Sequence, residues 1–314
     1  MQYKRYCAVS DFYRQKFGIK TYKLSLDAGC TCPTRDGTKG TGGCIFCSAA
    51  GSGDFAARRN FSITQQIEQA EQLIRNKYKG GRYIAYFQNF TNTYGDAGAL
   101  EKKYREAVTV PEIAGISIAT RPDCLGGDIL NRISSLCGTT FVSIELGLQT
   151  TNERTAAYIH RGYDTDIYDD AVYRIHRANP AIHIVTHVIF GLPGETDADM
   201  LETVCHSVRA GTDGIKIAVL HVLKGTVLAD EYAAGKFRCM EMKEYFEILS
   251  RAIELLPRNI VVHRLTGDGP KRLLVAPLWT AGKHVVHNAM ECWFDEHDIM
   301  QGRHSCCSDR KNAD

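Results

Sequence analysis

Short apolar segments alternate with amphipathic segments along most of this chain. The apolar segments predict six strands and a candidate seventh, at residues 22–26, 82–87, 115–119, 141–146, 182–190, 214–220 and 259–265. Helices are expected between them, from Ser62 and at about 97–108, 128–136, 151–178 (two helices), 196–210 and 241–256. Nearly continuous apolar strands joined by helical crossovers are typical of a parallel sheet that helices cover.

Polar residues recur at one position relative to the predicted strands, immediately after each strand. They are Asp27 with a cysteine-containing loop, residues 88–93, 120–123, 145–149 and 191–195, and His221. Six or more β/α units favour a barrel-like sheet over an open one, and such barrels place their active sites at the carboxyl ends of the strands. The sequence therefore predicts one functional site at one end of a barrel.

The composition is compatible with this fold and limits the cellular context. The 314 residues are 44% hydrophobic, enough for one α/β barrel or two small domains. The N-terminus is polar and aromatic, and no apolar run approaches the about 20 residues of a transmembrane helix, so we expect a cytoplasmic protein with no membrane partner. The net charge of +2 gives no global nucleic-acid signature, although basic pairs such as Arg58-Arg59 and Lys271-Arg272 permit an RNA partner.

Three cysteines in the loop after the first predicted strand carry the most specific chemical signal. Cys32, Cys44 and Cys47 have the spacing Cys-x11-Cys-x2-Cys. Three thiolates can hold three irons of a 4Fe–4S cluster and leave the fourth iron open to a substrate or cofactor. A radical S-adenosylmethionine (SAM) enzyme needs this arrangement, because the amino and carboxylate groups of SAM chelate the open iron.

A zinc site is the main alternative use of these cysteines. A structural zinc ion takes four Cys or His ligands, and Cys30 with Cys32, Cys44 and Cys47 would complete a zinc knuckle. A disulfide framework is not expected in a chain of this length, and most of the twelve cysteines are expected to be buried as small apolar side chains. The loop alone leaves iron and zinc open.

Longer motifs favour iron, because the chain resembles one radical SAM family. This is the compact group related to the catalytic subunit of Elongator but lacking its acetyltransferase domain. Besides the cysteines, the motifs are NFTNTY (89–94), SIATRPDCL (117–125), IELGLQT (144–150), RGYD (161–164), IFGLPGET (189–196), LHVLKGT (220–226) and HRLTGDGP (263–270). The resemblance covers nearly the whole chain. It implies a partial (β/α)6, TIM-like barrel over residues 21–257, with short extensions over 1–20 and 258–314, the latter packing on the barrel.

The resemblance also implies roles for residues of the cysteine loop. Cys32, Cys44 and Cys47 would hold the 4Fe–4S cluster at the mouth of the barrel. Cys30 would be a bystander, because the group usually has a non-ligand residue at that position. Phe46, which precedes the last cluster cysteine, would lie near the adenine of SAM.

Further contacts with SAM are implied at the ends of later strands. Glu145, taken to end the fourth strand, would bind the ribose hydroxyls, and Arg161 would pair with the SAM carboxylate through its guanidinium fork. The fifth-strand turn would lie along the adenine, with Gly191 and Pro193 in contact, because its glycines let backbone approach a flat ring. The usual Gly-Gly-Glu motif after the second strand is absent, and the residues that stand there are Gln88 and Asn89.

The resulting hypothesis is an enzyme that cleaves SAM reductively and uses the 5′-deoxyadenosyl radical to abstract hydrogen from a substrate. The resemblance implies a tRNA substrate, with wobble 5-carboxymethylaminomethyl-(2-thio)uridine converted to the 5-aminomethyl form. Expected partners are the tRNA anticodon loop and an electron donor such as flavodoxin or ferredoxin. Candidates to hold substrate at the mouth are Arg121, His187, His221, Lys224 and His263. The alternatives are a radical SAM enzyme for a small metabolite or protein, and a non-catalytic iron–sulfur or zinc protein.

Overall fold

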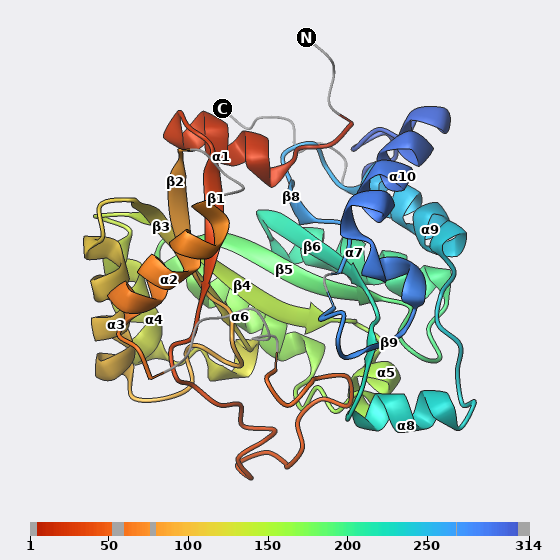
Figure 1. Ribbon diagram of the computed structural model, residues 1–314, viewed down its shortest axis with the longest axis horizontal. Coiled ribbons are helices and arrows are strands. Elements are labelled where there is room, and N and C mark those ends of the chain that lie inside the picture. The colour runs from red at the N-terminus through yellow and green to blue at the C-terminus, as the bar shows by residue number, and fades with distance from the viewer. Residues whose placement is uncertain (1–4, 52–59, 76–79, 268, 307–314) are drawn as a thin grey trace.

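A curled, all-parallel sheet of seven strands forms the centre of the molecule (Figure 1). The computed structural model describes residues 5–51, 60–75, 80–267 and 269–306. Neighbouring strands follow the chain order β1-β2-β3-β4-β5-β6-β8, each parallel to the next. Their bounds are Thr21–Leu26, Arg82–Phe87, Ile113–Thr120, Phe141–Gln149, His183–Phe190, Gly214–Val219 and Val261–Arg264. This sheet confirms the predicted partial TIM-like barrel, and the candidate seventh strand is present as β8.

Helices cover the outer face of the sheet, as the alternating sequence pattern predicted. They are α2 (Ile63–Arg75), α3 (Ala97–Thr109), α4 (Gly127–Leu136), α6 (Thr165–Ala178), α7 (Asp197–Ala210) and α9 (Met242–Leu255). The short helix α5 (Glu153–Tyr158) follows β4 and packs beside the cysteine loop. Ile116 and Ile118 of β3 share one buried apolar cluster with Ile133 of α4. The helix expected from Ser62 begins with reciprocal bonds, because the Ser62 N–H donates to Gln65 Oε1 (3.0 Å) and the Gln65 N–H donates to Ser62 Oγ (3.2 Å).

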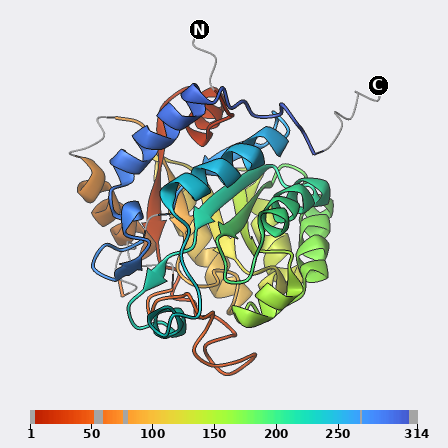
Figure 2. The same ribbon diagram turned by 90° about the vertical axis from the view of Figure 1, so that its right-hand side faces the viewer.

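Several short or terminal elements were not predicted from the sequence. They are α1 (Val9–Phe17), α8 (Val227–Ala233), α10 (Lys283–Glu296), the antiparallel pair β7 (Val222–Leu223) and β9 (Leu274–Ala276), and the 3₁₀ turns η1 (Pro122–Cys124) and η2 (Leu278–Ala281). Helix α10 packs on α9 through the apolar cluster that also covers β6 (Figure 2). Strand β8 lies inside the predicted C-terminal extension yet pairs with β6, so the sheet runs past the predicted core boundary at 257.

Helix α1 closes the amino-terminal end of the barrel, opposite the loop that follows β1 (Figure 1). Tyr13 of α1 is buried with Ile84 of β2, and the ring of Phe141 of β4 packs against it. The chain before α1 is joined to β8, because the Val262 N–H donates to the Cys7 carbonyl at 2.8 Å. This end of the barrel is therefore filled by aromatic side chains. No helix among the described residues has the length and apolar composition needed to span a membrane.

The inner face of the sheet is polar and is accessible near the carboxyl ends of the strands. Along β4 the outward residues Leu146 and Leu148 are fully buried, whereas the inward Gly147 and Gln149 are partly exposed. The same alternation appears on β5, where His187 is partly exposed. Successive residues of a strand point to opposite faces. The inward residues near the carboxyl ends of these strands are therefore accessible to solvent.

Candidate functional site

The cysteine loop lies across the carboxyl ends of the strands. We call this end of the barrel the mouth. The loop follows β1 and is anchored to segments that follow other strands. The Thr91 N–H, after β2, donates to the Thr31 carbonyl at 3.3 Å, and the Ile45 N–H donates to the carbonyl of Ile159 at 3.2 Å. These bonds hold the loop over the mouth on two sides, and Figure 1 shows it at the end opposite α1.

The three predicted cluster ligands are free, partly exposed thiols in this loop. A hydrogen bond between Cys44 and Cys47 lowers the pKa of Cys47 and raises the pKa of Cys44 well above its usual value. The charge of Arg35 also favours the Cys47 thiolate. The Arg35 guanidinium fixes the loop as well, donating to the carbonyls of Cys47 (3.3 Å) and Ser48 (2.7 Å). Arg35 was not predicted as a site residue.

The cysteine arrangement fits a three-thiolate cluster better than a zinc knuckle. Zinc requires four side chains that converge on one ion. Among the described residues, no three His, Cys, Asp or Glu side chains converge in this way. Cys30 is 6% exposed and belongs to the apolar core together with Tyr104 of α3. In a cubane each thiolate binds a different iron, so Cys32, Cys44 and Cys47 need not share one centre.

Residues at the end of β2 add an unsatisfied acceptor to the mouth. The Asn89 side chain is 6% exposed, and its Nδ2 donates to Asp27 Oδ2 at 2.7 Å. Its Oδ1 is buried and accepts no hydrogen bond from the described part of the chain. Gln88 is partly exposed beside it and accepts a hydrogen bond from the Ser25 hydroxyl at 3.2 Å. Buried acceptors of this kind usually have a partner, so Asn89 Oδ1 is suited to an incoming donor such as an ammonium group.

An apolar cluster joins the cysteine loop to the turn after β5. Phe46 packs against the cluster that contains Ile45 and Leu192. Gly191 has φ of +82°, and a Cβ there would lie 2.9 Å from Met240 Cγ, so the turn requires glycine. Pro193 is partly exposed in the same turn. The structure therefore brings Phe46, Gly191 and Pro193 into one region, as their predicted roles at the adenine require.

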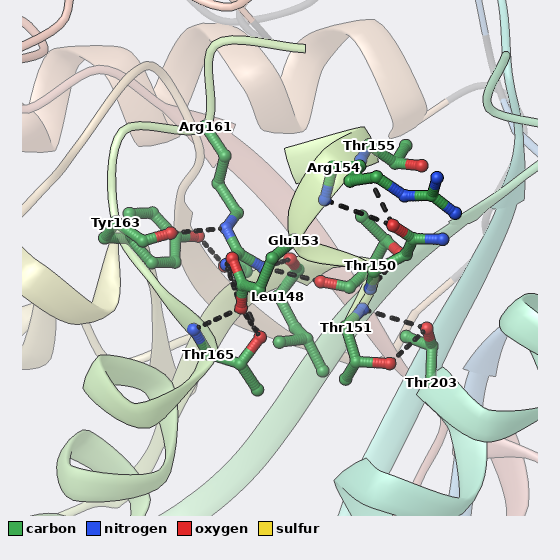
Figure 3. A network of polar contacts seen from close by, with 12 residues as sticks. Leu148, Thr150, Thr151, Glu153, Arg154, Thr155, Arg161, Tyr163, Thr165 and Thr203 are labelled. Atoms are coloured by element: carbon green, nitrogen blue, oxygen red, sulfur yellow. Dashed lines mark hydrogen bonds and ion pairs between the residues drawn. The ribbon is translucent and has the colours of Figure 1, made fainter. Parts of the chain in front are cut away.

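Arg161 is bound entirely by its own chain, which argues against its predicted role as partner of the SAM carboxylate (Figure 3). The side chain is 1% exposed. Its Nε donates to the Tyr163 carbonyl (2.7 Å), and Nη1 donates to the carbonyls of Leu148 (3.1 Å) and Thr150 (2.5 Å). Nη2 pairs with Glu153 Oε2 at 3.0 Å. Few of the five N–H donors of a guanidinium are left for a ligand, so Arg161 fixes the segment after β4.

Glu145 does not end its strand, because β4 continues to Gln149. The carboxylate is fully buried inside the barrel and accepts hydrogen bonds from Lys23 of β1 and Lys216 of β6. It also accepts from the Ser117 hydroxyl at 2.6 Å, and His187 Nε2 lies 2.7 Å from Oε2. Burial would raise the pKa of Glu145, but Lys216 and Lys23 hold it well below its usual value. A direct contact with the SAM ribose is therefore not supported.

The predicted substrate-holding residues are dispersed. Arg121 is 8% exposed, pairs with both oxygens of Asp123 at 2.9 Å, and favours the Cys44 thiolate electrostatically. His221 packs so closely beside Gly269 that a Cβ there would lie 3.0 Å from the His221 ring. Lys224 is exposed between β7 and α8.

His263 was expected at the mouth but lies at the opposite end of the barrel. Its Nε2 is 2.9 Å from His183 Nε2, and its ring contacts Tyr13 of α1. The prediction failed because His263 precedes the end of β8 by one residue and stands beside the start of β6, at Gly214. Arg58 and Arg59 lie outside the described residues.

Comparison with known families identifies the superfamily of the chain. The model of the radical SAM superfamily matches residues 37–204, and that of the Radical_SAM C-terminal domain matches residues 212–293. The chain belongs to the radical SAM superfamily. It is 40% identical over 300 residues to the uncharacterized protein YtqA of Bacillus subtilis, covering 96% of this chain and 92% of YtqA. It is 34% identical over 287 residues to protein YhcC of Escherichia coli, covering 91% of each. The protein is thus a radical SAM enzyme, whose cofactors are a 4Fe–4S cluster and SAM.

More distant likenesses cover part of the longer proteins. The tRNA uridine(34) acetyltransferase of Methanocaldococcus jannaschii is 26% identical over 184 residues, which are 57% of this chain and 33% of that protein. Among solved structures, the archaeal Methanocaldococcus infernus Elp3 aligns with a TM-score of 0.65 and 16% identity, over 90% of this chain and 64% of that chain. At this identity the structural likeness supports the radical SAM barrel fold alone.

Two lysines that face the interior of the radical SAM barrel were not predicted as site residues. Lys23 and Lys216 stand inside segments that were predicted as apolar strands, YKLSL and GIKIAVL. A charged residue within a strand buried on both faces is costly unless it is paired. The presence of lysines in these apolar segments could have predicted a polar inner face. In the structure both lysines pair with Glu145.

Proposed function

We propose that this radical SAM enzyme modifies the side chain of a tRNA wobble uridine, converting 5-carboxymethylaminomethyl-(2-thio)uridine to the 5-aminomethyl form. The observation that carries the proposal is its relation to a protein named for uridine 34 of tRNA. The accessible inner face below the cysteine loop supports it, because a base turned out of an anticodon loop could enter there. The tRNA anticodon loop is accordingly the proposed partner, and a flavodoxin or ferredoxin is the proposed electron donor.

Residues of the mouth would hold the cofactors. Cys32, Cys44 and Cys47 would ligate a 4Fe–4S cluster, which supplies the electron that splits SAM and so generates the radical. The buried, unpartnered Asn89 Oδ1 supports a role as acceptor for the SAM amino group. Phe46 and the Gly191 turn would flank the adenine, because they meet in one apolar cluster at the mouth.

Polar contacts around the cysteines would hold the segments of the mouth in fixed positions. Arg121 joins the end of β3 to the segment after β4, because its Nη1 donates to the Arg161 carbonyl at 2.7 Å. Lys39 of the cysteine loop pairs with Asp123 at 2.7 Å, which links the same region to the loop. These contacts orient the thiolates and would limit the entry of water to the reacting centre.

Two experiments test the proposal. Mass spectrometry of tRNA nucleosides from a strain lacking the gene should show 5-carboxymethylaminomethyl-(2-thio)uridine accumulating at the wobble position. The anaerobically reconstituted protein should convert such tRNA in the presence of SAM and a reductant. Unchanged wobble nucleosides in the strain, together with SAM cleavage that tRNA does not stimulate, would favour a small metabolite or protein as the substrate.

A further inference from the structure

The barrel interior holds more basic than acidic side chains at one level of the sheet. We call this group the floor cluster: Lys23 of β1, Tyr86 of β2, Glu145 of β4, His187 of β5, Lys216 of β6 and Arg264 of β8. Both lysines bond to Glu145, and Lys216 Nζ also lies 3.1 Å from the Tyr86 hydroxyl. Arg264 pairs in register with Lys216, so the two side chains share the inner face.

Counting charges in the floor cluster leaves an excess of positive charge. Burial and the nearby Lys216 lower the pKa of His187 to about 4, so this ring is neutral at pH 7. Burial, Lys23 and Arg264 also lower the pKa of Lys216, against the attraction of Glu145. Lys23 and Arg264 remain cationic against the single Glu145 carboxylate even when Lys216 is counted as neutral.

Among the described residues, the other titratable groups that face the interior do not offset this excess. Burial raises the pKa of both Tyr13 and Tyr86, and it lowers the pKa of His183 to about 4, so all three are neutral at pH 7. The inward carboxylate of Asp27 lies at the mouth, where the Asn89 amide and the Gly29 N–H donate to it at 2.7 and 2.6 Å. The net positive charge is therefore local to the floor cluster.

The floor cluster has unused capacity to bind an anion. Arg264 Nε is buried and donates to no atom in the described part of the chain. An ammonium group has three N–H donors, and among the described residues Lys216 donates to Glu145 and Tyr86. A buried positive charge without a counter-charge is unfavourable, so a ligand carboxylate would be stabilised there.

Two side chains of the floor cluster are accessible to solvent. The side chains of Lys23 and His187 are 20% and 24% exposed although they face the interior. Gln149, at the end of β4, is four residues beyond Glu145, which places the cluster about 13 Å below the mouth at a rise of about 3.3 Å per residue. SAM would be held at the mouth through its amino and carboxylate groups, so an anion bound at this depth would belong to another ligand.

We propose that the floor cluster binds the carboxylate of the carboxymethyl group of the substrate. This inference rests on the proposed function and names the part of the substrate that is recognised. The reaction breaks the bond between the amine nitrogen and the carboxymethyl group, so the whole group leaves together with its carboxylate, and the product keeps only an amine that is cationic at neutral pH. The same lysines and arginine that attract the substrate would repel the product, so the floor cluster would both select the carboxymethylated nucleoside and favour release of the aminomethylated one.

Matched anticodon stem-loops test the proposal. Binding to the anaerobically reconstituted protein is measured for one stem-loop carrying the 5-carboxymethylaminomethyl group and one carrying the 5-aminomethyl group. The wild type should prefer the carboxylate-bearing stem-loop by about tenfold or more, the size expected for charge-assisted hydrogen bonds. Equal affinity for the two stem-loops in the wild type would overturn the proposal.

Variants that remove a positive charge are compared with one that removes a negative charge, which separates loss of carboxylate recognition from damage to the fold. Lys216→Gln and Arg264→Gln should each reduce the preference several-fold, whereas Glu145→Gln removes the competing internal carboxylate and should keep or increase it. The control Lys243→Gln, on the outer face of α9 with a side chain 74% exposed, should leave the preference unchanged. A loss of preference in Glu145→Gln equal to that in Lys216→Gln, at unchanged iron content, would contradict the proposal.

A fragment experiment keeps the inference separate from the proposed tRNA substrate. N-methylglycine carries the same carboxymethylamino group, and dimethylamine lacks the carboxylate. The reconstituted wild type should gain thermal stability with N-methylglycine but not with dimethylamine, and Lys216→Gln should lose the gain. This result would support the floor cluster even if no tRNA bound. Conversion of tRNA without any carboxylate preference, in stem-loops or fragments, would reject the floor cluster while leaving the proposed function intact.

Discussion

At the scale of single residues, the four cysteines near the mouth differ in what surrounds each sulfur. We expect Cys32→Ala, Cys44→Ala and Cys47→Ala each to abolish the cluster, because each removes one of the three thiolates expected to hold it. Cys30→Ala should retain iron, because Cys30 is buried in the apolar core. Iron and sulfide content after anaerobic reconstitution, with the visible absorbance, measures this. Iron loss in Cys30→Ala as complete as in Cys32→Ala would contradict the ligand assignment.

Arg161 is expected to act on stability, not on SAM affinity. Replacing it by alanine leaves three backbone carbonyls and Glu153 without their donor, at a cost of about 3 kcal/mol in the free energy of unfolding. Urea unfolding of Arg161→Ala measures the loss. The neighbouring Arg154 is exposed, so Arg154→Ala is a matched control that should change stability little. A large loss of SAM affinity in Arg161→Ala at unchanged stability would restore its predicted role as partner of the SAM carboxylate.

At the scale of elements, the turn between β5 and α7 contains a carboxyl group in an unusual state. Burial raises the pKa of Glu195 to about 7, and the Thr150 hydroxyl donates to its Oε1 while Oε2 is buried. The folded state therefore binds a proton that the unfolded chain has released. Stability from this group is present below the unfolded pKa, near 4.5, and is lost as pH rises through about 7.

We therefore expect Glu195→Gln to stabilise the protein at pH 8 and to have little effect at pH 4.5. The gain should be on the order of 2–3 kcal/mol, because the amide is neutral at every pH and keeps an acceptor for Thr150. Urea unfolding at the two pH values tests this, and each value serves as the control for the other. Equal effects at both pH values would show that ionisation of Glu195 does not govern the stability of this turn.

Strands and crossover helices could be predicted because burial on both faces leaves long apolar runs. The pattern failed where the barrel is polar inside. The predicted fourth strand stopped at Glu145 and Leu146, since a charged residue is normally found where a strand ends. The strand β4 instead continues to Gln149, and Glu145 forms ion pairs with lysines across the barrel. Helix α1 was missed because its apolar residues are aromatic and interspersed with charges. Contacts across the barrel join segments that are far apart in the sequence, so they could not be predicted from the local pattern of apolar and polar residues.

At the scale of the whole molecule, three exposed basic residues meet at one edge of the mouth. Lys271 and Arg272 are separated from β9 by Leu273, and β9 pairs with β7 just beyond the carboxyl end of β6. Lys224 is brought beside them, because its N–H donates to the Leu273 carbonyl at 2.7 Å. The net charge of the chain is only +2, so tRNA affinity would depend on such local groups and not on the charge of the whole protein.

We expect tRNA binding to weaken steeply with salt, because basic side chains that contact phosphates release counterions. The double variant Lys271→Gln/Arg272→Gln should lower tRNA affinity and reduce the slope of log K against log salt by about 1.5, since each lost phosphate contact removes about 0.7–0.9. Fluorescence anisotropy with labelled tRNA between low and physiological salt measures the slope. The control Lys236→Gln/Lys243→Gln removes the same charge from side chains 60% and 74% exposed near α8 and on α9, and should leave the slope nearly unchanged. Equal slopes for both double variants would show that tRNA does not bind at this edge, and the absence of any salt dependence would favour a substrate other than tRNA.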